Sequence, residues 1–306
     1  MNVQEFLNEN HEVRQAVESA IKEEITEVTL MSKGSTNRSY LVRTNCNSYV
    51  LRVPGKGAED MVDRYLEKEI YSLINGYDVG DQVIYLNPEN GIKISIYYEN
   101  ARFLDLTKEK DVKLFLKTVK KLHGLNLQCS GEYDFFKNIL KYENLRNSSS
   151  RFEDYESVKK DILSLKSFTE VYCGSRTLIH NDLSNENCLL FKGEDGKEKC
   201  VLIDFEYAAM QCPAADIAYF CVFSELDEAA IDKIIEDYYE DDCSVENYAR
   251  VYAYIALNAL LHSNWLELKL SLENVHKEKR IKESIKAFNL AKLYYKKFEE
   301  VKNAES

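Results

Sequence analysis

The hydrophobic and polar positions of the first hundred residues alternate in short runs. Three β-rich runs, ITEVTLM, SYLVR and SYVLRV, lie within residues 25–53, separated by the turn-forming clusters KGSTN and TNCN. Two further runs, QVIYLN and IKISIYY, flank the turn PENG. This pattern predicts one five-stranded sheet whose first three strands are antiparallel. An amphipathic helix is expected over residues 4–22, and a charged helix over residues 59–75.

Helical periodicity dominates from Lys108 onward. Only residues 177–206 interrupt it, with the apolar runs TLIH, CLLF and VLIDF around polar loops. The sequence therefore predicts an α+β chain of two lobes. Residues 1–100 form the small, antiparallel-sheet lobe, and residues 101–306 form the larger, mainly helical lobe. The helices expected in the larger lobe are DVKLFLKTVKKLHGL and those at 152–168, 227–240, 244–270 and 274–300.

Composition and charge narrow the class of protein. Hydrophobic residues make up 45% of the 306 positions, which is too many for a disordered chain. The 52 acidic and 40 basic side chains give a net charge of −12, which disfavours nucleic acid and anionic lipid as partners. No apolar run approaches the ~20 residues of a membrane helix. The eight cysteines lack metal-ligand spacing. We expect a cytoplasmic protein with reduced, buried thiols and no membrane span.

The most informative segment is LIHNDLSNENCLLFKGEDGKEKCVLIDFE, at residues 178–206. Asp182 ends the motif HND, Asn187 follows five residues later, and Asp204 begins the motif DFE after a predicted strand pair. Kinases place their catalytic and metal-binding loops in this order. Phosphoryl transfer needs a carboxylate that accepts the proton of the attacking hydroxyl, and oxygen ligands for Mg²⁺. Asp182 suits the first role, and Asn187 and Asp204 suit the second.

A loop in the N-terminal part offers a counterpart for the nucleotide. Ser35, Thr36 and Asn37 belong to the segment SKGSTN, which joins two predicted strands. Small residues there would leave backbone amides available to phosphate oxygens. An ordinary hairpin turn has the same composition, so both interpretations stand.

Arg52 strengthens the phosphate-binding interpretation. It lies in YVLRVPG, one strand later, where protein kinases keep a lysine for the phosphates. The guanidinium is always charged and offers a fork of donors. Its partner on the following helix could be Glu67 or Glu69, of which we favour Glu67.

The ordered motifs HND, IDFEY and DIA, together with GSTNRSY, YVLRVPG and DRYLE, resemble the choline/ethanolamine kinases. The resemblance spans residues 30–225 in order and implies a protein kinase-like fold of the aminoglycoside phosphotransferase type. The segment ADIAYFCVFSELDEAAIDKIIEDYY is similar to bacterial choline kinases. It lacks the continuation NHFCEW of the eukaryotic members, which leaves the acceptor less certain than the reaction.

The resemblance implies a role for each matching residue. Asp182 would be the catalytic base and Asp216 would brace the catalytic loop. Glu206 and Tyr207 would stand near the metal and the acceptor. The adenine would lie near residues 97–100, which include Glu99. The implied cofactors are ATP and Mg²⁺, with the phosphate contact, its ion-pair partner and the metal ligands at Arg52, Glu67, Asn187 and Asp204.

A cationic acceptor needs aromatic faces and carboxylates. His262 and Trp265 lie three residues apart in ALLHSNWLELKL and share a helix face. Trp265, the one tryptophan of the chain, is the best candidate for a cation-binding cage, although a tryptophan in such a helix can equally belong to the core. Tyr207, Tyr219 and Phe223 are possible companions.

These observations predict an ATP-dependent kinase that converts choline to phosphocholine. Ethanolamine or an aminoglycoside remains possible as the acceptor. A catalytically inactive kinase-like scaffold is a remote alternative, because Asp182, Asn187 and Asp204 are all present. The pattern does not indicate an oligomeric state.

Overall fold

The structure is a computed structural model that describes most of the chain, namely residues 3–33, 37–55, 62–272 and 276–304. The chain divides into two compact units. The first comprises Met1–Lys121 and Glu186–Ala208, and the second comprises Leu122–Asn185 and Ala209–Ser306. The segment of the DFE motif thus packs with the N-terminal part of the chain. The predicted assignment of nucleotide binding to residues 1–100 is a functional division and stays a prediction.

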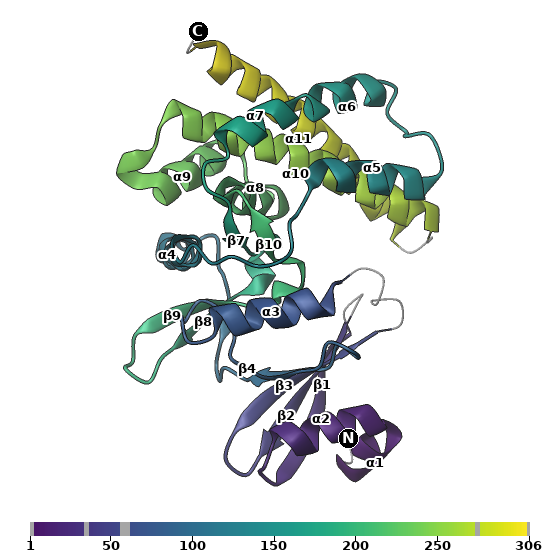
Figure 1. Ribbon diagram of the computed structural model, residues 1–306, viewed down its shortest axis with the longest axis vertical. Helices are drawn as coiled ribbons and strands as arrows, with labels where there is room; N and C mark the ends of the chain where they lie inside the picture. The colour runs from purple at the N-terminus through teal and green to yellow at the C-terminus, as the bar shows by residue number, and fades with distance from the viewer. Residues whose placement is uncertain (1–2, 34–36, 56–61, 273–275, 305–306) are drawn as a thin grey trace. The chain divides into compact units, whose positions relative to one another are not determined.

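The first unit contains the predicted five-stranded sheet, in the order β1-β2-β3-β5-β4 (Figure 1). Every neighbouring pair is antiparallel. The five strands are β1 (Ile25–Lys33), β2 (Asn37–Thr44), β3 (Ser48–Pro54), β4 (Val83–Leu86) and β5 (Lys93–Ile96).

Two short helices cover one face of this sheet. The predicted helix over 4–22 is in fact α1 (Val3–Glu9) and α2 (His11–Ala20). The two helices are separated by Asn10. Its side chain accepts a hydrogen bond from the backbone N–H of Val13 and so caps α2. Apolar side chains of both helices, among them Phe6, Val13 and Val17, form a common core with strands β1, β2, β3 and β5. The sheet-rich part therefore has two short helices where the sequence predicted one longer helix.

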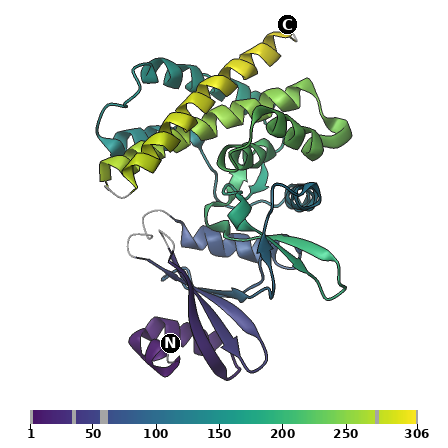
Figure 2. The ribbon, with the colours of Figure 1, turned by 180° about the vertical axis from the view of Figure 1, so that it is seen from behind.

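Helix α3 (Arg64–Ile74) lies on the other face of the sheet, as Figures 1 and 2 show. It corresponds to the helix predicted over 59–75. The first unit also contains the hairpin of β8 (Cys188–Lys192) and β9 (Glu198–Leu202), which the turn segment KGEDGKEK closes. Strand β6 (Arg102–Phe103) pairs with β8. The hairpin carries the ends of the two kinase-like motifs, because Asn187 precedes β8 and Asp204 follows β9.

The second unit is mainly helical. Its longest helices, α10 (Val245–Leu272) and α11 (Lys277–Ala304), pack side by side (Figure 2). Strands β7 (Thr177–Ile179) and β10 (Ala209–Gln211) form a small antiparallel pair. The helix predicted over 152–168 is split at Ser164 into two. The remaining helices are α4 (Glu109–Gly124), which begins in the first unit, α5 (Phe135–Arg146), α6 (Tyr155–Leu163), α7 (Leu165–Tyr172), α8 (Pro213–Phe223) and α9 (Glu228–Tyr239).

Among the described residues, no helix is long and apolar enough to cross a membrane. All eight cysteines are free thiols, of which five are buried and Cys46 is exposed. The expectation of reduced thiols agrees with this, but the expectation that all are buried is wrong for Cys46, which lies in the turn between β2 and β3, and for Cys129 and Cys243, which are partly exposed.

Candidate active site

Arg52 enters the site from the face of the sheet that carries α3. Tyr49 and Leu51 of β3 point into the core formed with α1 and α2. Because side chains alternate along a strand, Arg52 points to the opposite face. Its side chain is only 5% exposed. The strand register thus places a buried cation under α3.

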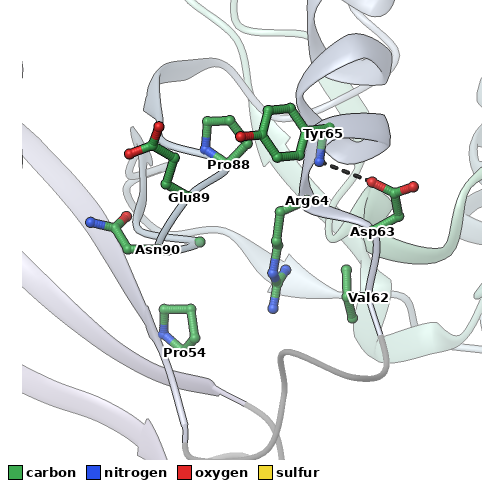
Figure 3. A pocket seen from close by; sticks show the side chains of 9 residues that line it. Pro54, Val62, Asp63, Arg64, Tyr65, Pro88, Glu89 and Asn90 are labelled. Carbon is green, nitrogen blue, oxygen red and sulfur yellow. Dashed lines mark hydrogen bonds between the residues drawn. The ribbon is translucent and has the colours of Figure 1, made fainter.

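The start of α3 fixes the direction of a second arginine. Asp63 caps the helix, and its carboxylate accepts hydrogen bonds from the backbone N–H groups of Tyr65 (3.1 Å) and Leu66 (3.0 Å). Figure 3 shows the cap and the Arg64 side chain, which runs from the helix start into the space between Pro54 and Val62. The cap therefore sets where Arg64 leaves the helix.

The pocket beside Arg64 has a volume of about 290 Å³. Gly91 closes it at the turn between β4 and β5, with a φ of +66°. A Cβ atom at Gly91 would lie 2.7 Å from Cγ of Pro54 and 3.0 Å from Nε of Arg64. The glycine of the PENG turn is required here both for its backbone conformation and for the passage of Arg64.

Two arginines and three carboxylates meet in the first unit. Oε2 of Glu67 accepts hydrogen bonds from Nη2 of Arg52 (2.8 Å) and from Nη1 of Arg64 (2.8 Å). Nη1 of Arg64 also donates to Oε2 of Glu206 (2.9 Å). Nη1 of Arg52 contacts Asp204 (2.9 Å) and Glu206 (3.4 Å). These five side chains are called the ionic cluster. Glu67 is the helical partner of Arg52.

Burial and charge act against each other in the ionic cluster. Burial lowers the pKa of Arg52, but the carboxylates of Glu67 and Asp204 outweigh it and hold this pKa above its usual value. Burial raises the pKa of Glu206, and Asp204 raises it further, whereas Arg52 and Arg64 oppose both effects. With two positive and three negative groups, the cluster has one excess negative charge, which suits a cation.

Asp204 is the carboxylate of the cluster that solvent reaches. Its side chain is 33% exposed, against 0% for Glu67 and 4% for Glu206. Its φ of +67° lies in the left-handed region that side chains seldom adopt. The next residue, Phe205, is fully buried and packs edge-on against Tyr71 at 5.7 Å. The buried phenylalanine anchors the turn, so that the strained backbone directs Asp204 toward solvent.

The donor set of the first unit fits a hard cation such as Mg²⁺. Carboxylate oxygens of Glu67, Asp204 and Glu206 lie within 4.8 Å of one another. Asn187 ends the short turn before β8, and its backbone carbonyl accepts a hydrogen bond from the backbone N–H of Ile203 at 2.9 Å. The residues predicted as metal ligands, Asn187 and Asp204, thus stand at adjacent strand ends.

Two buried donors of the cluster lack a hydrogen-bond acceptor among the described residues. They are Nε of Arg52 and Nη2 of Arg64. A buried N–H group without an acceptor costs about 1–3 kcal/mol. Arg52 and Arg64 therefore each keep one buried donor that the described carboxylates of the cluster do not use.

The predicted phosphate loop is described only in part. Ser35 and Thr36 lie outside the described residues. Asn37 begins β2, and its amide donates to Oε2 of Glu206 at 3.2 Å. This contact joins the end of the loop to the ionic cluster.

Glu99 lies after β5, at an exposed corner of the first unit. Its carboxylate accepts hydrogen bonds from Arg43 (2.9 Å) and from the hydroxyl of Ser48 (3.0 Å), and its side chain is 53% exposed. These contacts hold the side chain against the sheet edge. Its predicted place near an adenine, within residues 97–100, stays a prediction.

The motif HND lies in the second unit and is held by a buried carboxylate. Asp216 of α8 is fully buried and accepts hydrogen bonds from the backbone N–H groups of His180 (2.8 Å) and Asn181 (2.7 Å). Nε2 of His123 lies 2.9 Å from the same carboxylate, and Nδ1 of His123 lies 2.7 Å from the hydroxyl of Tyr238. Residues 180–182 with Asp216 are called the base loop. The bracing position expected for Asp216 is what the structure has.

The carboxylate of Asp182 contacts a residue of α8, the helix that also carries Asp216. The hydroxyl of Tyr219 donates to Oδ1 of Asp182 at 2.5 Å. The Tyr219 ring stacks on Phe223, with centroids 4.0 Å apart and an angle of 13° between the planes. The sequence had identified Tyr219 only as a companion for a cationic ligand.

A continuous series of ring contacts leads from Tyr219 to Trp265. Phe223 meets His262 edge-on at 4.5 Å, and His262 stacks on Trp265 at 5.8 Å. The last three rings line a cavity of about 220 Å³ together with two carboxylates and one ammonium, from Glu225, Glu283 and Lys286. Trp265 is half-buried and lies at a cavity, so it is not enclosed in the core.

The charges at this cavity are compatible with a cationic ligand. Burial lowers the pKa of His262 to about 4, so the imidazole is neutral near pH 7. Lys286 is paired with Glu225 at 2.7 Å. The ammonium of Lys269 lies 5.7 Å from the centroid of the Trp265 ring, so a cationic ligand at this ring would compete with it. We call this cavity the aromatic pocket.

The predicted site residues fall in both units. Asn37, Arg52, Glu67, Asn187, Asp204, Glu206 and Tyr207 belong to the first unit, and Asp182 and Trp265 belong to the second. Tyr207 ends the short turn Phe205–Tyr207 next to Glu206.

Sequence reasoning missed Arg64 as a member of the ionic cluster. Its spacing of three from Glu67 was a usable signal. It also missed His123 as a support of the base loop, for which no local pattern exists.

Comparisons with known proteins agree with these observations. The sequence matches the model of the family described as choline/ethanolamine kinase over residues 16–298. Protein LicA of Haemophilus influenzae is 27% identical over 216 residues, which cover 67% of this chain and 60% of that protein. The chain thus spans about 60% of the length of this curated relative. A probable ethanolamine kinase of Arabidopsis thaliana is 29% identical over 132 residues, covering 39% of this chain and 34% of that protein.

Solved structures extend the similarity to the whole fold. The choline kinase LicA from Streptococcus pneumoniae matches with a TM-score of 0.75 at 25% identity, covering 92% of this chain and 99% of that chain. A structure of LicA in complex with AMP matches with the same TM-score and identity, covering 94% of this chain and 99% of that chain. The predicted two-part, protein kinase-like fold is confirmed.

Proposed function

Because the chain belongs to the choline/ethanolamine kinase family, we propose that it transfers the γ-phosphoryl group of ATP to choline, giving phosphocholine and ADP. Membership of the family indicates a phosphotransferase that acts on an alcohol. The observation that carries the choice of choline is the aromatic pocket, whose rings lead in unbroken contact to the residue that binds Asp182.

The ionic cluster is proposed to serve the nucleotide. Arg52 contacts the phosphates, and Glu67 fixes its direction through their buried ion pair. Asn37 and the preceding Ser35 and Thr36 cover the phosphates. Residues 97–100, including Glu99, are proposed to border the adenine. The complex of LicA with AMP supports a nucleotide site in this fold.

Asn187 and Asp204 are proposed to hold Mg²⁺. When bound, the ion neutralises charge on the phosphates and so favours the loose transition state of phosphoryl transfer. Glu206 and Tyr207 stand beside this site. Glu206 is held by Arg64, which keeps its carboxylate near Asp204 in spite of their repulsion.

Asp182 is proposed to act as the base. Its carboxylate accepts the proton of the choline hydroxyl while the oxygen of that hydroxyl forms a bond to the γ-phosphorus. The bond from this phosphorus to the β–γ bridging oxygen breaks, and ADP leaves. A base of this kind contributes about 10²–10⁴-fold to the rate. In this scheme residues 1–100 hold the nucleotide, and residues 101–306 hold the base and the acceptor.

The aromatic pocket is proposed to bind the quaternary ammonium of choline. Each good contact of a cation with an aromatic face contributes roughly 0.5–2 kcal/mol. His262 is neutral and Lys286 is already paired, so neither opposes the ligand strongly. Since ATP is the phosphoryl donor, we place the reaction in the cytoplasm.

Ethanolamine is the second candidate acceptor. Glu225 and Glu283 at the aromatic pocket could accept hydrogen bonds from a primary ammonium, which a quaternary ammonium cannot donate. The similarity to a probable ethanolamine kinase also favours this candidate.

The acceptor is tested by measuring ADP release with choline, ethanolamine and an aminoglycoside as separate substrates. We expect the highest kcat/KM with choline. Trp265→Ala should raise the KM for choline by about tenfold or more and affect ethanolamine less, whereas Trp265→Phe should retain most of the affinity. A higher kcat/KM with ethanolamine in the wild type would contradict the choice of choline. Equal losses for both acceptors in Trp265→Ala would contradict the proposal that the aromatic pocket binds the quaternary ammonium.

The base is tested with Asp182→Ala. We expect kcat to fall by about 10²–10⁴-fold while the circular dichroism spectrum and the melting temperature stay near those of the wild type. Near-normal turnover in this variant would refute the mechanism.

A further inference from the structure

Helix α8 holds the base loop at two points. Asp216 and Tyr219 lie three residues apart and therefore share one face of the helix. Asp216 accepts hydrogen bonds from the backbone of residues 180 and 181. Tyr219 reaches the side chain of Asp182 itself. One helix face thus fixes both the backbone of the loop and the direction of its carboxylate.

Tyr219 and Asp182 are joined by a hydrogen bond in which the hydroxyl donates to the carboxylate. A hydrogen bond to an ionised group is stronger than one between neutral groups. Stacking on Phe223 fixes the plane of the phenol ring, so the hydroxyl has little freedom to leave. Phe223 is in turn held by His262. The donor is therefore placed by packing before any substrate binds.

We propose that the hydroxyl of Tyr219 is a positioning group that fixes the Asp182 carboxylate for proton acceptance. This inference rests on the proposed function, because it assumes that Asp182 is the base. An aspartate side chain without such a contact samples several rotamers, and a displacement of about 1 Å can cost about 10²-fold in rate. The role differs from that of a cage residue, since it needs the hydroxyl of Tyr219 and not its aromatic face.

The test separates the hydroxyl from the ring. Tyr219→Phe removes the oxygen and keeps the ring on Phe223. We expect kcat to fall by about 10–100-fold, with the KM values for choline and ATP within about twofold of the wild type. Tyr219→Ala removes both features and should also raise the KM for choline. Unchanged kcat in Tyr219→Phe overturns the proposal, and so does a rise in KM alone, because that would mean direct contact with the acceptor.

Tyr252→Phe is the matched control. The hydroxyl of Tyr252 donates to Asp232 at 2.6 Å in the same unit, away from the base loop. Its loss removes the same kind of hydrogen bond and should lower the melting temperature to a similar degree. We expect kcat in this variant to stay within about twofold of the wild type. A comparable loss of kcat in both variants would mean that stability alone explains the effect.

A structural readout keeps this test independent of the acceptor. In crystal structures of both variants, Asp182 should change its rotamer in Tyr219→Phe and keep it in Tyr252→Phe. An unchanged Asp182 in Tyr219→Phe overturns the proposal whatever the substrate is. If the wild type does not phosphorylate choline but Asp182 moves as expected, the proposed acceptor fails and the positioning role stands.

Discussion

Buried carboxylates are held by different partners in the ionic cluster and in the base loop. In the cluster, Glu67 and Glu206 are buried and are held by charged guanidinium groups. In the base loop, Asp216 is buried and is held by two backbone N–H groups and an imidazole. The first region depends on balanced charge, and the second depends on hydrogen-bond geometry. A substitution that removes a charge should therefore lower the stability more in the ionic cluster. A substitution that keeps the charge but changes the shape should lower it more in the base loop.

The largest effect is expected from breaking the charge balance. Arg52→Met leaves the three carboxylates of the ionic cluster with Arg64 as the one cation of the cluster, and should lower the free energy of unfolding by about 3–5 kcal/mol. Arg52→Lys keeps the charge and should lose less. Urea unfolding near pH 7.5 measures both. The double variant Arg52→Met with Glu67→Gln should recover part of the loss, because it removes one of the excess negative charges that Arg52→Met leaves in the cluster.

The view that the ionic cluster depends on balanced charge would be contradicted if Arg52→Met lowered the free energy of unfolding by less than about 1 kcal/mol. It would also be contradicted if the double variant were no more stable than Arg52→Met. Either result would mean that the buried pair adds little beyond packing.

A smaller effect is expected from titrating the aromatic pocket. Burial lowers the pKa of His262 to about 4 from its ordinary value of 6.5. Between these values the unfolded chain binds a proton that the folded chain does not. The contribution of the neutral imidazole to stability is therefore complete above about pH 6.5 and is lost as the pH falls toward 4. The expected loss is about 1–3 kcal/mol.

Melting temperatures of the wild type and of His262→Phe between pH 4.5 and 7.5 measure this effect. The variant keeps an aromatic ring that does not titrate, so its melting temperature should fall less toward low pH. Parallel curves for the two proteins would show that His262 is not buried as neutral imidazole.

The smallest effect is expected from an ion pair at the surface. Arg43 and Glu99 are joined at 2.9 Å, nearly the same distance as in the buried pair, but both are well exposed. Glu99→Gln should change the free energy of unfolding by less than about 1 kcal/mol. Thermal unfolding with and without added salt measures it. A loss as large as that of Arg52→Met would contradict the view that burial makes the ionic cluster sensitive to charge.

The sequence predicted much of the fold because its turns and alternating runs are local signals. KGSTN, TNCN and PENG lie between the strands of the observed sheet, and KGEDGKEK closes the observed hairpin. The break at Asn10 was missed because apolar periodicity continues across it. The Asn10 side chain marks the boundary, because it accepts a hydrogen bond from the backbone N–H of Val13 and so starts the second helix.

The candidate site was predictable where its residues are close in sequence. The order of Asp182, Asn187 and Asp204 follows from the one segment 178–206, and Glu67 follows from the start of a helix. Arg64 was missed as the ion-pair partner of Glu206 because the two residues are 142 positions apart in the sequence. Nothing in the local pattern of either residue reports that contact.

The sequence by itself determined the alternation that buries Leu51 and turns Arg52 away from the same core, and the order of the kinase-like motifs. The tertiary structure alone decided that Arg64 joins Glu67 to Glu206 and that the Tyr219 hydroxyl meets Asp182. The physical reason is the distance along the chain over which each interaction acts. Alternation and turn chemistry act between neighbours in the chain, whereas charge pairing and hydrogen bonding in a buried site depend on which distant segments share a volume.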